Sequence, residues 1–231
     1  MIKEETRQQL MDWAAIYNDP VYFMEDPIAF PRKFLERGAS LQDIEIAAVF
    51  SAHFAWGRRA MIVRDSNRLM DEMGWQPYEY VLSGDYRNDP TSIHRTVKWS
   101  EVAQICTRLR QFYDNNESLE SLDQAAMRTL IYGQKEDPKA ANKKINMLRR
   151  WMVRRDGKVD LGVWKNSSPA DLIVPLDVHV YTQAVALGLT ERKPKDITTA
   201  MQITDAFREI WPEDPLMGDF ALFGYGVTRN A

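Results

Sequence analysis

A single acid, Asp177, stands at the start of a segment whose spacing predicts a helix. The segment 172–187 reads LIVPLDVHVYTQAVAL, and Pro175 favours an extended conformation for Val174 before it. Apolar residues then recur at intervals of three and four, as on one helix face. We therefore expect Asp177 at or next to the N-cap, where its carboxylate accepts backbone N–H bonds. Capping alone would explain this residue, but a fixed carboxylate can also stabilise positive charge that develops in a reaction.

Two lysines, Lys143 and Lys144, open a second predicted helix, over 142–155. An uncharged lysine amine is a nucleophile that can form a Schiff base with a suitable substrate carbon. A helix N-terminus and neighbouring cations both favour the uncharged amine that attacks. Eight basic residues and one acid lie between Lys139 and Lys158. Such a block is either a solvated face or a surface for nucleic-acid phosphates.

The stretch VPLDVHV resembles the VDxH segment of the helix-hairpin-helix DNA glycosylases, the superfamily of endonuclease III and 8-oxoguanine DNA glycosylase. The resemblance implies that Asp177 is catalytic. It also favours Lys143 as the amine, because Asn146 follows at the spacing seen in that superfamily. On a helical wheel, however, Lys144 lies nearer the centre of the apolar arc, so Lys144 remains a second choice.

Two features depart from the common glycosylase pattern. No LPGVG-like hairpin precedes Lys143, and Lys143 and Asp177 are 34 residues apart. Both features resemble the divergent archaeal 8-oxoguanine glycosylases. The chain as a whole also resembles an uncharacterised bacterial family of similar length.

The resemblance extends to residues that would contact DNA. Ser51-Ala52-His53 resembles a helix end whose amide side chain enters the DNA in the glycosylases, with His53 in its place; a histidine satisfied by backbone is the alternative. Met147 and Trp151 share a stripe with Lys143 and would form one wall of a base pocket, although core packing is the preferred explanation of such a stripe. The candidate phosphate contacts are Arg58, Arg59, Arg149, Arg150 and Arg154. No metal or cofactor is implied.

The spacing of apolar residues predicts an all-α protein, and the resemblance implies two lobes with a cleft between them. Lobe one would be residues 40–140, and lobe two would combine 1–39 with 141–231. No segment alternates with a period of two, so no sheet is expected. Helices are predicted over 3–16, 31–37, 40–54, 58–73, 77–82, 99–114, 117–131, 142–155, 177–187, 198–210 and 214–227.

Composition limits the alternatives. The single cysteine, Cys106, excludes an intrachain disulfide and a four-cysteine iron–sulfur cluster, and its helical setting favours buried packing. The polar N-terminus and the absence of a long apolar run predict a cytoplasmic protein, expected to be a monomer. A net charge of −3 and a pI near 5.7 count against nucleic-acid binding.

The function expected from the resemblance is a DNA glycosylase with AP-lyase activity. Its partner would be double-stranded DNA that carries an oxidised purine such as 8-oxoguanine. Two alternatives remain open. One is a non-catalytic nucleic-acid-binding protein of the same fold, and the other is an N-glycoside hydrolase that acts on a small nucleoside through Asp177 alone.

Overall fold

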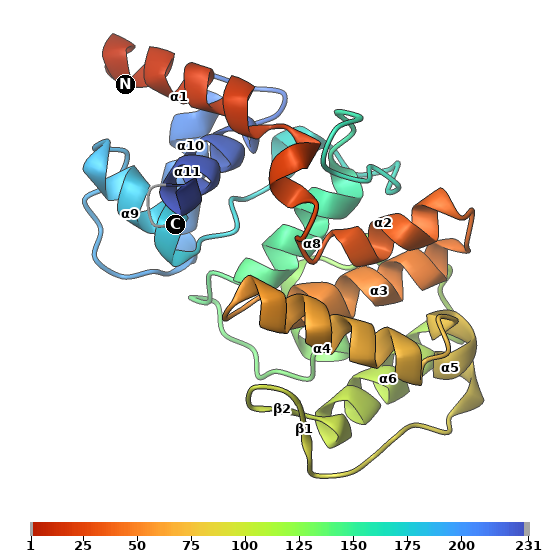
Figure 1. Cartoon of the computed structure of the whole chain (residues 1–231). Helices are drawn as coiled ribbons and strands as arrows, with labels where there is room; N and C mark the ends of the chain where they lie inside the picture. Colours follow the sequence, from red (N-terminus) through yellow and green to blue (C-terminus); the bar gives the residue numbers. More distant parts are fainter. Residues whose placement is uncertain (1, 229–231) are drawn as a thin grey trace. The chain divides into compact units, whose positions relative to one another are not determined.

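The computed structural model describes residues 2–228, with only the backbone of Val227, and these residues are mostly helical (Figure 1). The all-α prediction is confirmed. The α-helices are α1 (Glu4–Tyr17), α2 (Ala29–Glu36), α3 (Leu41–Phe54), α4 (Arg59–Glu72), α5 (Pro77–Ser83), α6 (Trp99–Tyr113), α7 (Gln124–Ala126), α8 (Lys143–Val153), α9 (Val178–Ala186), α10 (Ile197–Arg208) and α11 (Met217–Thr228). Within the described residues, no helix is both long enough and apolar enough to cross a membrane.

The expectation of no sheet is wrong in one place. Strands β1 (Ser92–His94) and β2 (Val97–Lys98) pair antiparallel as a short hairpin. The strands are three and two residues long, too short for a period of two to be visible in the sequence.

The chain divides into two compact units, residues 1–23 with 137–231 and residues 24–136. Residues 24–39 therefore group with 40–136, whereas the sequence had placed them in the other lobe. The reason is that α2 packs on α3 and buries Phe30 and Phe34, which both stack against Trp75.

Unit 24–136 is built on α3. Ser40 caps this helix by accepting from the backbone N–H of Asp43 at 3.1 Å, as the spacing of the two residues predicted. Every residue from Ile44 to Phe54 is buried, which confirms the prediction of a buried helix. Glu45 is the one acid among these buried residues. Its carboxylate accepts from the Tyr113 hydroxyl at 2.8 Å and from the Leu119 backbone N–H at 3.1 Å.

The helix predicted over 117–131 is divided into three. It consists of a 3₁₀ turn (Leu119–Ser121), α7 and a π-helical turn (Met127–Ile131). Leu122 is extended, and Asp123 begins a new helix by accepting from the backbone N–H of Ala126 at 2.8 Å. A side chain that caps a new N-terminus competes with continuation of the preceding turn.

Unit 1–23 with 137–231 is built on α11, which lies between α1 and α9 in Figure 1. Residues 220–222 of α11 are fully buried. Glycines let neighbours approach the helix closely: a Cβ at Gly218 would collide with Phe207 of α10, and one at Gly224 would collide with Tyr17 of α1. Since glycine costs about 1 kcal/mol relative to alanine in a helix interior, these two positions indicate that close packing outweighs helix propensity.

Candidate active site

Asp177 is the N-cap of α9, as the sequence predicted. Its Oδ1 accepts from the backbone N–H of Val180 at 2.8 Å, and its backbone carbonyl accepts from the N–H of Tyr181 at 3.0 Å. The side chain is half-buried. Within the described residues, Oδ2 accepts no hydrogen bond, so Oδ1 is the oxygen that holds the helix.

Lys143 is the first residue of α8, and its backbone is fixed by the turn before it. Asn142 adopts a left-handed conformation (φ 48°) at the N-cap. The buried side chain of Asn146 donates to the carbonyl of Ala141 at 3.0 Å, and the N–H of Ile197 donates to the carbonyl of Lys139 at 3.0 Å. Asn146 therefore has a structural role, since it fastens the turn that presents the lysine.

The two lysines lie on different faces of α8, and both are half-buried. Residues seven apart lie almost in line on an α-helix. Lys143 is in line with Arg150, whose guanidinium reaches α11, whereas Lys144 is in line with Trp151, which is 0% exposed. Lys143 thus shares the face of α8 that meets polar groups, and Lys144 shares the face that enters the core.

Two arginines of the basic block belong to a buried ion-pair network. Arg150 donates to Asp219 at 2.5 Å and to Asp160 at 3.3 Å. Arg154, which is 0% exposed, donates to Asp160 at 2.6 Å and to Asp214 at 2.8 Å. The prediction that these arginines contact DNA phosphates is therefore wrong, because their charges are neutralised inside the unit.

The network changes the protonation of its own members. Burial raises the pKa of Asp219 to about 6, against the opposing charge of Arg150. The nearby charge of Asp177 also raises the pKa of Asp219, which places these two carboxyl groups within electrostatic range. Burial alone would lower the pKa of Arg150, but Asp160 and Asp219 more than offset it, so the pKa of Arg150 is raised.

Helix α11 also contacts the helix that Asp177 caps. The ring of His179 meets Phe223 edge-on, with centroids 6.2 Å apart. A Cβ at Gly226 would lie 3.0 Å from the Cβ of His179, so α9 and α11 are in close contact there. Lys143 and Asp177 therefore begin two helices, α8 and α9, that are both attached to α11, although no direct contact joins the two side chains.

The predicted base-pocket residues differ in position. Met147 is half-buried, but Trp151 is a core residue without exposed surface, and a base could not stack on it in this conformation. The prediction that Trp151 forms a pocket wall is therefore wrong. Arg149 is half-buried, and its guanidinium lies 6.0 Å from the ring of buried Trp164.

The other predicted DNA contacts lie in unit 24–136. His53 is 8% exposed, its Nε2 lies 2.9 Å from Glu101, and its ring stacks on Tyr132. Insertion of His53 into DNA is therefore not supported, because the side chain is enclosed. Arg58 is exposed at the N-cap of α4, and Arg59 lies 3.7 Å from Asp26. These two arginines remain candidate phosphate contacts.

The sequence reasoning missed the acids of the network, Asp160, Asp214 and Asp219. One signal for Asp219 was present, since it is the lone acid in the apolar segment MGDFALFGYGV. An acid in a segment that will be buried needs a charged partner. Arg150 and Arg154, four apart on a helix with an apolar face, were the matching signal.

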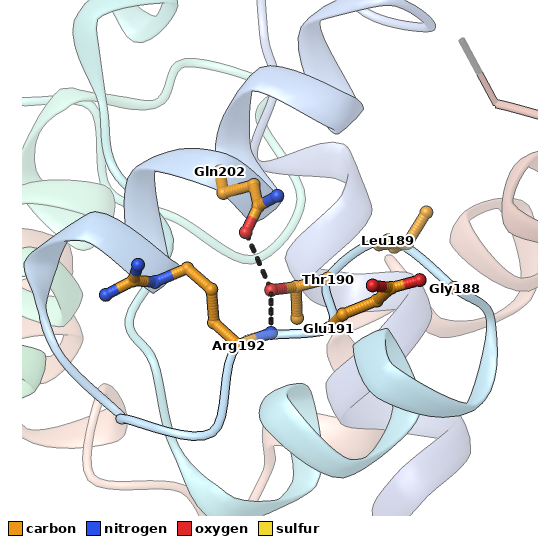
Figure 2. A pocket seen from close by; sticks show the side chains of 6 residues that line it. All are labelled: Gly188, Leu189, Thr190, Glu191, Arg192 and Gln202. Carbon is orange, nitrogen blue, oxygen red and sulfur yellow. Dashed lines mark hydrogen bonds between the residues drawn. The ribbon is translucent and has the colours of Figure 1, made fainter.

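A separate pocket of about 480 Å³ lies beyond the C-terminal end of α9 (Figure 2). Its lining residues are Gly188, Leu189, Thr190, Glu191, Arg192 and Gln202. Thr190 donates to Gln202 at 2.8 Å and accepts from the backbone N–H of Arg192 at 3.2 Å. A helix of nine residues is about 14 Å long, so this pocket lies well away from Asp177 at the other end of α9.

Comparison with protein families gives one match. Residues 26–138 and 123–228 match the family described as Protein of unknown function (DUF2400). Comparisons with curated proteins and with solved structures give no significant match. The matched segments together span most of the chain, and the chain belongs to the DUF2400 family.

Proposed function

We propose that this member of the DUF2400 family is a DNA glycosylase with AP-lyase activity that removes an oxidised purine, such as 8-oxoguanine, from double-stranded DNA. The sequence support is the resemblance of VPLDVHV and of the Lys143–Asn146 spacing to the glycosylases. The observation that carries the proposal is the geometry of Asp177. One oxygen caps α9 and the other is uncommitted, so the carboxylate is held in place and can still meet a ligand.

In the proposed reaction, the amine of Lys143 attacks C1′ of the damaged nucleotide. A bond forms between Nζ and C1′ while the bond between C1′ and the base breaks, and the leaving base takes up a proton. The carboxylate of Asp177 stabilises the positive charge on the sugar. The C1′–O4′ bond then breaks, O4′ takes up a proton and a C=N bond forms, so that the opened sugar is held as a Schiff base. The Schiff base acidifies the hydrogen on C2′, whose loss expels the 3′ phosphate by β-elimination.

The structure supports Lys143 over Lys144 as the amine. Lys143 is in line with Arg150, which forms an ion pair with Asp219 of α11. The charge of Asp177 is one of the causes that raise the pKa of Asp219. Lys143 therefore shares its side of α8 with the residue that pairs with α11, the helix that also packs against α9. Lys144 is in line with the enclosed Trp151 instead.

A non-catalytic nucleic-acid-binding protein is the second candidate. One observation favours it: Arg58, Arg64 and Arg68 are exposed cations of unit 24–136, which contains neither Lys143 nor Asp177. This alternative predicts DNA binding that does not depend on Lys143 or Asp177.

The test is incision of a duplex that contains 8-oxoguanine, measured with and without hot alkali. Alkali reveals base release, whereas scission without alkali reports the lyase step. Lys143→Ala is expected to abolish scission, and Asp177→Asn is expected to slow base release by roughly 100-fold or more, as loss of one preorganised electrostatic group does. Lys158→Ala, which removes an exposed lysine of the same block, is the control and should cut normally.

Three results separate the candidates. Scission lost in Lys144→Ala and retained in Lys143→Ala would assign the amine to Lys144. Base release without scission would make Asp177 the catalyst of a glycosylase without lyase activity. No release from a panel of oxidised purines, with DNA still bound, would favour the non-catalytic protein.

A further inference from the structure

Unit 24–136 carries an exposed tryptophan with an arginine stacked on it. Trp56, in the loop between α3 and α4, is 38% exposed. The guanidinium carbon of Arg95, in the turn between β1 and β2, lies 4.4 Å from the centroid of its ring. An exposed Arg–Trp stack is a flat polarisable surface whose charge faces solvent.

The backbone on both sides is shaped to make this stack. Gly57 has φ 110° and Arg95 has φ 52°, both in the left-handed region. A Cβ at Gly57 would lie 2.8 Å from Nη1 of Arg95, so the arginine crosses the chain where only glycine leaves room. A left-handed arginine is strained, and such strain persists where the surrounding structure fixes it.

His94 is the residue that fixes it. This histidine is fully buried, and both ring nitrogens face oxygen acceptors: Nδ1 lies 2.8 Å from Asp65 and Nε2 lies 3.0 Å from the carbonyl of Trp56. Its ring also packs edge-on against Trp56. One side chain thereby ties the hairpin to α4 and to the loop of Trp56, so the stack is preorganised.

Arginines follow Trp56 in the chain. From Trp56 to Arg68 the chain has four arginines and one acid, and that acid, Asp65, is buried beneath Arg64 and Arg68. Arg68 also donates to the carbonyl of Ile93 at 3.1 Å, which joins it to the hairpin. The side chains of Arg64 and Arg68 are 63% and 46% exposed. The excess of positive charge selects a polyanion.

We propose that the Trp56–Arg95 stack is a platform for an unpaired nucleobase of a single-stranded nucleic acid, whose phosphates Arg58, Arg64 and Arg68 contact. Single strands are bound by aromatic side chains that stack bases, within a cationic surface that follows the backbone. Arginine planes serve as stacking surfaces as well. This platform rests on the proposed function only in requiring a nucleic-acid partner, and it requires neither Lys143 nor Asp177.

The test is the affinity of the full chain for an undamaged, fluorescein-labelled dT₂₀ strand, measured by fluorescence anisotropy at several salt concentrations. Trp56→Leu, which keeps an apolar side chain without an aromatic face, is expected to weaken binding roughly 5- to 150-fold, the effect of one stacked base. Trp56→Phe is expected to bind nearly as the wild type. Arg95→Ala is expected to weaken binding because it removes one member of the stack. Arg58→Ala is expected to reduce the slope of log K against log salt by roughly 0.7, the contribution of one single-strand phosphate contact.

Lys33→Ala is the matched control. Lys33 lies over the ring of Trp75, 5.1 Å from its centroid, in the same unit, so this variant removes a comparable cation–aromatic pair. It should bind as the wild type does. Wild-type binding by Trp56→Leu, an equal loss in Lys33→Ala, or no binding of the strand by the wild type would each overturn the platform. If the wild type does not incise lesion-containing duplexes but Trp56→Leu still weakens binding of the single strand, the glycosylase proposal is contradicted and the platform is supported.

Discussion

At the scale of single residues, Asp177 combines two roles that substitutions can separate. Asparagine caps a helix about as well as aspartate, whereas alanine does not. We therefore expect Asp177→Asn to keep the wild-type free energy of unfolding within about 0.5 kcal/mol and to lose base release. Asp177→Ala should lose both activity and about 1 kcal/mol of stability. Urea denaturation checks the stabilities, and equal destabilisation by the two variants would contradict the cap.

Asp219 gives a pH-dependent prediction. Its pKa in the folded chain is about 6, above the ordinary value of 3.8, so between these values the folded state holds a proton that the unfolded state has lost. The contribution of this group to stability is therefore present near pH 4 and declines as the pH rises through 6. The difference in unfolding free energy between the wild type and Asp219→Asn should fall over this interval. A difference that stays constant from pH 4 to pH 7 would contradict the raised pKa.

Local interactions could be predicted from the sequence, and distant ones could not. Asp177 and Ser40 each bond a backbone N–H three residues ahead, so the chemistry of a cap shows in a short window. Arg150 finds Asp219 at a separation of 69 residues, and Arg154 finds Asp214 at 60. The basic block therefore looked like a surface, because two of the acids that neutralise it, Asp214 and Asp219, are far away in the chain.

At the scale of elements, α11 connects the helices that carry Lys143 and Asp177. Its contacts are an ion pair to α8, a glycine against α9 and another glycine against α1. The helix boundaries were mostly predictable, because apolar spacing and caps are local. The hairpin 92–98 could not be predicted, because its strands are too short to show a pattern. The division of 117–131 could not be predicted either, because it depends on Asp123 starting a new helix.

Gly224 tests the close packing of α11. A Cβ there would collide with the ring of Tyr17, so Gly224→Ala should destabilise the chain by about 1–3 kcal/mol despite the better helix propensity of alanine. Gly226→Ala is the milder variant for comparison, because its Cβ would lie 3.0 Å from the Cβ of His179, a less severe overlap than that of Gly224 with Tyr17. We expect a smaller loss in thermal or urea denaturation for Gly226→Ala. Equal stability of Gly224→Ala and the wild type would contradict the packing.

At the scale of the whole molecule, an acidic chain divides its arginines between interior and surface. Arg150 and Arg154 neutralise buried acids, whereas Arg64 and Arg68, which follow Trp56, remain at the surface. The net charge of −3 conceals this division, which is why composition alone argued against nucleic-acid binding.

Two arginine substitutions should therefore affect different properties, one the stability of the chain and the other its DNA binding. Arg154→Ala removes the closer of the two arginines that pair with buried Asp160, and also the partner of half-buried Asp214, and should cost about 3–5 kcal/mol of stability. Arg58→Ala, at an exposed helix start, should change stability by less than about 0.5 kcal/mol. It should instead weaken DNA binding and lower the salt slope on duplex DNA by roughly 0.9. Urea denaturation and anisotropy measure the two effects, and a stable Arg154→Ala protein would contradict the buried network.

The central claim is that Lys143 forms a Schiff base with DNA. Sodium borohydride should trap the wild-type chain on a duplex with 8-oxoguanine or an abasic site, and mass spectrometry of the digested adduct would locate the modified residue. The account predicts a nucleotide remnant on Lys143. An adduct on Lys144, or no adduct on either duplex, would contradict it.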